Sequence, residues 1–121
     1  MRELAVELPG GTVRGLRWGE AGRPPVLALH GWLDNAASFV PLAAHLEGIE
    51  LVAIDLPGHG RSAHLPPGAD YSFAAAVHLV LDVADALGWE RFALLGHSMG
   101  AGISSLVAAA CPERVRRLVA I

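Results

Sequence analysis

The feature that most constrains the fold is an alternation of short, uninterrupted apolar runs with longer segments of helical character. The apolar runs are expected to be strands, at 25–30, 50–55, 91–97 and 117–121, and the helices are expected at 35–46, 72–87 and 99–110. Strands that are apolar on both sides are typical of a parallel sheet covered on both faces. Two further β-rich runs, 3–8 and 12–18, flank a Pro-Gly-Gly turn and predict a hairpin. The sequence therefore predicts an α/β fold: a mostly parallel sheet with helices on both faces and an antiparallel N-terminal hairpin.

Composition excludes several classes of protein. Of the 121 residues, 53% are hydrophobic and 17% are charged, which is too apolar for a disordered chain. The net charge of −3 and the absence of basic runs argue against nucleic-acid binding. Cys111 is the single cysteine, so neither an intrachain disulfide nor a cysteine-based zinc site can form. The start of the chain does not resemble a signal peptide, and no apolar stretch reaches the length of a membrane span, so we expect a cytoplasmic protein without a membrane partner.

The last apolar run raises a question about domain organisation. We interpret 1–121 as a single domain, but Leu118–Ile121 has the character of a buried central strand with nothing polar after it. This pattern favours the front part of a larger domain, truncated after the strand at 117–121. A short edge strand at the end of a complete small protein is the alternative. An exposed strand edge here could bind a second copy of the chain or a separate chain that supplies the second half.

Gly96-His97-Ser98-Met99-Gly100 matches Gly-x-Ser-x-Gly and lies between a predicted strand and a predicted helix. A serine on such a sharp turn adopts a strained backbone conformation that raises its hydroxyl above the sheet. Residues two before and two after the serine must then pack closely, which explains glycine at positions 96 and 100. The motif predicts Ser98 as a catalytic nucleophile, supported by Gly96 and Gly100.

His30-Gly31-Trp32 follows an earlier strand, at the edge of the sheet where ligands bind in such folds. A loop at this place can bring a backbone N–H opposite the N–H that follows the nucleophile. We therefore predict an oxyanion hole formed by the backbone N–H groups of Trp32 and Met99. His30 itself is expected to be a structural histidine whose ring fixes the loop.

The segment from Asp55 to Ser62 contains a glycine pattern that formally matches a dinucleotide-binding loop, Gly58 to Ala63. Prolines follow where the phosphate-binding helix would have to begin, so we reject that function. A Walker A motif is also absent. The better interpretation is a tight loop beside the active-site mouth, with Asp55 and Arg61 as structural polar anchors.

Together, His30 to Asn35, Asp55 to Ser62 and Gly96 to Gly100 resemble the α/β-hydrolase superfamily, in the same order along the chain. The run from His30 to Phe39 is most similar to the serine hydrolase-like proteins within it. The resemblance implies acyl transfer by Ser98 without a metal or cofactor, on a small ester-like or thioester-like substrate. Serine at the elbow, in place of the aspartate of dehalogenases and epoxide hydrolases, points to a carbonyl substrate.

The sequence departs from that family after the nucleophile. Members carry an acid and then a histidine downstream of the serine, but all six histidines of this chain precede Ser98. We therefore expect a serine hydrolase that lacks its catalytic acid and base within these residues and has little activity alone. A base rearranged from His30 or His59 is a minor alternative. The other hypothesis is a non-catalytic module of the same fold that assembles with a partner chain.

Overall fold

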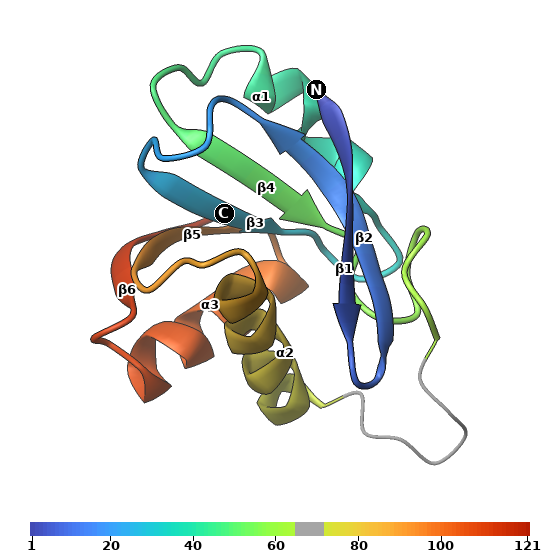
Figure 1. The fold of residues 1–121 in the computed structure, drawn as a ribbon. Helices are drawn as coiled ribbons and strands as arrows, with labels where there is room; N and C mark the ends of the chain where they lie inside the picture. Colours follow the sequence, from blue (N-terminus) through green and yellow to red (C-terminus); the bar gives the residue numbers. More distant parts are fainter. Residues whose placement is uncertain (65–71) are drawn as a thin grey trace.

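A computed structural model describes residues 1–64 and 72–121, and it contains one mixed six-stranded sheet (Figure 1). The strand order is β1-β2-β4-β3-β5-β6, in which β3, β4, β5 and β6 run parallel and β2 is antiparallel to both of its neighbours, β1 and β4. The strands are β1 Arg2–Leu8, β2 Gly11–Trp18, β3 Pro25–Leu29, β4 Glu50–Ile54, β5 Phe92–Gly96 and β6 Val115–Ala120. The predicted fold class is confirmed.

Helices cover both faces of the sheet and divide the core into two parts. On one face lie α2 Phe73–Ala86 and α3 Met99–Ala110, which pack on the larger cluster of buried side chains. On the other face the 3₁₀ helix η1 Ala36–Phe39 and α1 Val40–Ala43 cover a smaller cluster around Phe39 and Leu95. Because side chains alternate along each strand, every central strand feeds both clusters, which explains its uninterrupted apolar sequence.

One predicted element differs in type from the structure. The helix expected over 35–46 is a 3₁₀ turn followed by one turn of α-helix. Asn35 caps this segment by accepting a hydrogen bond from the N–H of Ala37. Pro41 follows in the first turn of α1, where its missing N–H is tolerated only at a helix start, so the segment cannot form one continuous helix.

The last strand has the apolar sequence of a buried central strand, yet within residues 1–121 it lies at the edge of the sheet. Its interpretation as part of a larger domain stays a prediction. β6 is the outermost strand of the sheet, and its burial is intermediate at Val115 and low from Arg116 onward. Val119 is 54% exposed and Ile121 is 67% exposed. The physical reason is that β6 has a neighbour on one side and α3 on one face, but the described residues place no helix over its second face.

Some interpretations fall partly on residues 65–71. The prolines and glycine that argue against a dinucleotide-binding helix lie there, outside the described residues. The cap of α2 lies within the described residues. The hydroxyl of Ser72 accepts a hydrogen bond from the N–H of Ala75, as the sequence predicts. Among the described helices, none combines the length and apolar character needed to span a membrane.

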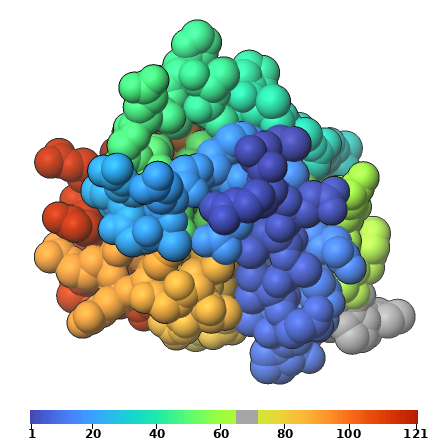
Figure 2. All heavy atoms as spheres, turned by 45° about the horizontal axis from the view of Figure 1, so that its top comes forward, coloured from blue at the N-terminus to red at the C-terminus, as the bar shows by residue number. Residues whose placement is uncertain are grey.

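A buried ionic network stabilises the end of the sheet opposite the carboxyl ends of the parallel strands. In Figure 2, the chain around residue 20 (light blue) lies beside the chain around residue 90 (orange) at this end of the molecule. Glu50 is 3% exposed and accepts hydrogen bonds from the indole N–H of Trp89 at 3.1 Å and the guanidinium of Arg17 at 2.8 Å. One carboxylate thus satisfies donors from two distant parts of the chain.

Glu50→Ala is expected to lower the free energy of unfolding by about 3 kcal/mol, because it leaves a buried indole donor and a partly buried guanidinium without their acceptor. Urea denaturation followed by tryptophan fluorescence and circular dichroism measures this change. Glu47→Ala is the control, since Glu47 is exposed and its removal should change stability by less than about 0.5 kcal/mol. Equal effects of the two substitutions would contradict this role for Glu50.

Candidate active site

Ser98 occupies a sharp turn between β5 and α3. Its φ of 54° and ψ of −114° lie in a region that non-glycine residues rarely adopt. The neighbouring backbone holds this conformation: the N–H of Ser98 donates to the carbonyl of Ile121 at 2.9 Å, and the Ser98 carbonyl accepts from the N–H of Ala101 at 2.9 Å. The Ser98 side chain is exposed, and within the described residues its hydroxyl makes no hydrogen bond. The turn therefore presents an unpaired hydroxyl at the carboxyl edge of the sheet.

Gly96 and Gly100 allow strand and helix to approach closely at this turn. A Cβ on Gly96 would overlap the backbone of Gly100 and Ala101, and a Cβ on Gly100 would overlap the carbonyl group of Leu29. Both positions therefore exclude every side chain, as the motif predicts. The result is that α3 begins directly against the end of β3.

The loop after β3 lies beside Ser98. A Cβ added to Gly31 would stand 3.4 Å from the Cβ of Ser98. Within the described residues, neither the N–H of Trp32 nor that of Met99 donates a hydrogen bond, and the Trp32 side chain is 72% exposed. Two backbone donors without partners are thus carried by the two segments that flank the serine.

Leu33 is a feature of this loop that sequence reasoning missed. Its φ is +58°, and Leu33 and Ser98 are the non-glycine residues with positive φ among the described residues. Backbone strain of this kind clusters at functional sites. No sequence pattern signals it, because leucine has no preference for this conformation.

His30 and Asp55 fix the loops around the site. The buried His30 ring accepts a hydrogen bond at Nε2 from the N–H of Leu56, at 3.0 Å, and its Nδ1 lies 2.6 Å from the carbonyl oxygen of Gly31. The Asp55 carboxylate accepts from the N–H of Ala36 at 2.7 Å and the N–H of Arg61 at 3.0 Å. These contacts agree with the structural roles predicted for both side chains.

Arg61 acts differently from the prediction in one respect. Its backbone N–H serves the anchoring role, whereas its exposed guanidinium pairs with Glu3 on β1 at 2.9 Å. The side chain therefore fixes the loop to the hairpin from outside. An exposed ion pair of this kind contributes little to stability.

Burial lowers the pKa of His30 below its usual 6.5, because the cation would lose its hydration, and the nearby His59 ring adds to this effect. The folded state then binds fewer protons than the unfolded state below pH 6.5. Stability should therefore be full above pH 6.5 and should fall as the pH decreases from there toward the lowered pKa. The pH dependence of the urea midpoint in the wild type and in His30→Gln measures this, and the variant should have a shallower slope below pH 6.5. His45→Gln removes an exposed histidine and should keep the wild-type slope.

No histidine is paired with the candidate nucleophile in the part of the chain that the structure describes. His30 is buried and held on both ring nitrogens, and the His59 ring lies 5.0 Å from the His30 ring with its Nδ1 3.1 Å from the Pro57 carbonyl oxygen. His97 is exposed and makes no hydrogen bond to Ser98, as its place on the elbow predicts. The site as described thus contains a strained serine and two free N–H donors, without a base in contact.

This arrangement can be compared with known proteins. A sequence model of the α/β hydrolase fold matches residues 24–121, which is most of the chain. The chain belongs to the α/β-hydrolase fold family. The matched residues include β3 to β6 and the serine turn between β5 and α3, whereas the antiparallel hairpin precedes them.

Individual α/β-hydrolases extend the comparison. A serine hydrolase-like protein of Danio rerio is 43% identical over 97% of this chain and 36% of its own length. The crystal structure of the hypothetical protein PA1622 from Pseudomonas aeruginosa superposes with a TM-score of 0.96 and 50% identity, over 100% of this chain and 43% of that one. A thioesterase domain from the curacin biosynthetic pathway superposes with a TM-score of 0.87 and 34% identity, over 100% of this chain and 46% of that one. The chain therefore spans less than half the length of these three relatives.

Proposed function

We propose that this chain carries the nucleophile of a serine hydrolase that acts on small ester-like or thioester-like substrates. The observation that carries the proposal is the exposed Ser98, strained and without a hydrogen-bond partner in the described residues, beside the unpaired N–H groups of Trp32 and Met99. The serine turn lies at the N-terminus of the twelve-residue helix α3, whose dipole favours a developing negative charge.

The proposed reaction is acyl transfer in two steps. The Ser98 hydroxyl oxygen bonds to the substrate carbonyl carbon while a base removes its proton, and the carbonyl oxygen becomes an oxyanion held by the N–H groups of Trp32 and Met99. The oxyanion then collapses, the bond to the alcohol or thiol breaks, and the leaving group takes the proton. Water subsequently hydrolyses the acyl–serine ester and restores the hydroxyl.

The base and its orienting acid are proposed to come from outside residues 1–121. All six histidines precede Ser98, and none of them contacts its hydroxyl in the described structure. The short span of this chain on its relatives supports the same interpretation. Without a base the hydroxyl is a weak nucleophile, so the chain alone should have little activity.

A non-catalytic assembly module is the second candidate, favoured by the exposed apolar side chains at the β6 edge, Leu118, Val119 and Ile121. Under this proposal the edge binds a separate chain that continues the sheet. It predicts that such an edge is covered in the functional protein and that Ser98 never becomes acylated.

The two candidates are separated by mapping acyl adducts. After prolonged incubation with p-nitrophenyl butyrate, mass spectrometry should find a butyryl group on Ser98, and the Ser98→Ala chain should carry none. Styrene oxide should give no adduct on Ser98, because the opening of an epoxide would call for an aspartate nucleophile in place of the serine. A butyryl group found only on other residues, or at the same level in Ser98→Ala, would contradict the hydrolase proposal.

A further inference from the structure

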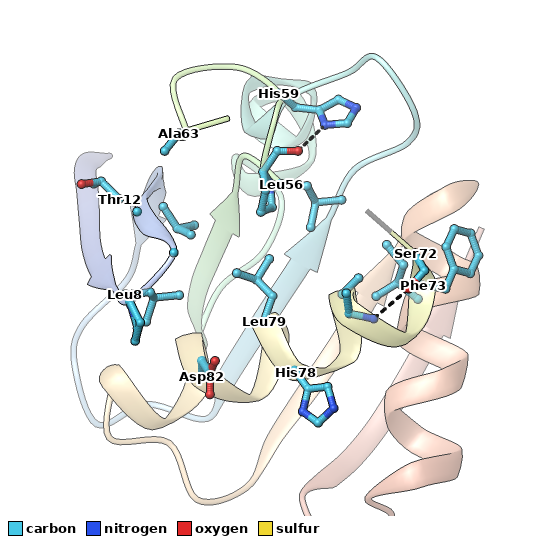
Figure 3. Close-up of a pocket in the computed structure, with 18 of the residues that line it drawn as sticks. Leu8, Thr12, Leu56, His59, Ala63, Ser72, Phe73, His78, Leu79 and Asp82 are labelled. Atoms are coloured by element: carbon cyan, nitrogen blue, oxygen red, sulfur yellow. Dashed lines mark hydrogen bonds between the residues drawn. The ribbon is translucent and has the colours of Figure 1, made fainter. Parts of the chain in front are cut away.

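A cavity of about 510 Å³ lies beside the candidate active site, between the tip of the β1–β2 hairpin, the loop after β4 and the first turns of α2 (Figure 3). Its volume is in the range of small-molecule sites. Trp32 and Met99 line its wall, but Ser98 does not. The cavity therefore begins next to the two residues that carry the proposed oxyanion donors, and one of them, Met99, directly follows the nucleophile in the sequence.

The lining is mostly apolar. Leu8 and Val13 come from the hairpin, Leu56 from the loop after β4, and Leu79 and Ile103 from α2 and α3. In Figure 3, Leu8 and Thr12 lie on the hairpin side of the cavity and Leu79 on the α2 side. Such a lining favours hydrocarbon, because each buried methylene contributes about 0.8 kcal/mol.

The ionisable groups of the lining disfavour an acidic occupant. None of the described residues that line the cavity is an arginine, and the chain contains no lysine. The carboxylate of the lining is Asp82, which is exposed on α2 and would repel an anion, and the lining also holds the imidazole rings of His59 and His78. A phosphate or a free carboxylate would thus find no arginine or lysine in the described lining to pair with, whereas a neutral acyl chain needs no such partner.

We infer that this cavity is an acyl-chain pocket, which makes the preferred substrates of the proposed hydrolase esters of neutral, apolar, medium-length acyl groups. The scissile carbonyl would lie at Ser98, with its oxygen at the N–H groups of Trp32 and Met99. The acyl chain of the substrate would then enter the cavity past Met99 toward Leu79. This inference rests on the proposed function for its catalytic meaning, but the pocket can be tested without catalysis.

The test uses the Ser98→Ala chain, which cannot be acylated at that position, and measures its affinity for methyl butyrate, methyl hexanoate and methyl octanoate. The readouts are the tryptophan fluorescence, to which the pocket residue Trp32 contributes beside Trp18 and Trp89, and the amide chemical shifts in NMR spectra. Affinity should rise about threefold to fourfold for each added methylene. Monomethyl suberate, which ends in a carboxylate, should bind at least tenfold more weakly than methyl octanoate.

A pocket-filling variant locates the binding. Ala76, on the cavity wall, is partly buried, and Ala76→Phe should abolish the dependence of affinity on chain length. Ala109→Phe, at an exposed position near the end of α3, is the matched control and should keep that dependence. If Ala76→Phe fails to fold, the chemical-shift changes of the Ser98→Ala chain on addition of methyl octanoate locate the binding site instead. They should centre on Thr12, Leu79 and Met99.

The outcomes separate this inference from the proposed function. A chain-length dependence that is absent, or unchanged in Ala76→Phe, would overturn the pocket even if Ser98 is acylated. A normal chain-length dependence without acylation of Ser98 in the wild type would keep the pocket as a binding site and remove the hydrolase proposal.

Discussion

Ser98→Ala is expected to lower ester turnover by about 10⁶-fold in a polypeptide extended past Ile121 that also carries the acid and the histidine. The physical reason is that serine, histidine and acid act as a unit, so loss of the nucleophile removes covalent catalysis. A residual acceleration of roughly 10³ to 10⁴ over water should persist, because the N–H groups of Trp32 and Met99 and the binding surface are unchanged. Initial rates with p-nitrophenyl butyrate measure both quantities.

Ser105→Ala is the matched control for this substitution. Ser105 is an exposed serine on the same helix, and its hydroxyl donates to the carbonyl of Ala101 at 2.8 Å. Its loss should leave turnover within about twofold, because no part of the proposed reaction touches it. A turnover that survives Ser98→Ala would show that the hydrolysis occurs elsewhere in the protein.

Gly100→Ala is expected to lower the free energy of unfolding by at least about 3 kcal/mol, which is a large part of the total stability of a small domain. The added methyl group would overlap the backbone carbonyl of Leu29, which is fixed in the middle of the sheet and cannot move aside. α3 would have to shift away from β3, and the serine turn would be distorted with it. Thermal and urea denaturation measure the loss.

Gly102→Ala tests whether the effect is specific to the turn. Gly102 lies in the same helix, but an added Cβ would meet the ring of Phe73, at 2.8 Å, and that ring is 41% exposed and can rotate. Replacing a helical glycine by alanine also gains up to about 1 kcal/mol in helix propensity. Stability should therefore change by less than about 1 kcal/mol. A Gly102→Ala loss as large as that of Gly100→Ala would contradict the close-packing argument.

The order of the elements and the turn around Ser98 could be predicted from the sequence because both rest on local patterns. Uninterrupted apolar runs such as 51–54 indicate strands covered on both faces, and a serine between two glycines at a strand–helix junction indicates the elbow. The roles of His30 and Asp55 could also be anticipated, since polar side chains at strand ends commonly satisfy the backbone of the adjoining loops.

Features that depend on distant contacts could not be predicted in this way. The hydrogen bond from the N–H of Ala36 to Asp55 joins the start of the 3₁₀ turn to another part of the chain, and no local pattern indicates it. The exposure of β6 depends on which elements cover the sheet, and the strand's own apolar sequence cannot indicate that. The cavity joins the hairpin tip to α2, and these segments are more than 50 residues apart.

The central claim is that Ser98 is a nucleophile whose base lies outside residues 1–121. Its most direct test is the rate of covalent labelling by a fluorophosphonate, with the adduct mapped by mass spectrometry, in this chain and in a polypeptide extended past Ile121 by its own reading frame. We predict slow labelling of the chain and rapid labelling of the extended form, both at Ser98 and both absent in Ser98→Ala. Rapid labelling of Ser98 in the 121-residue chain would contradict the claim, because a base would then have to reach the hydroxyl from within it.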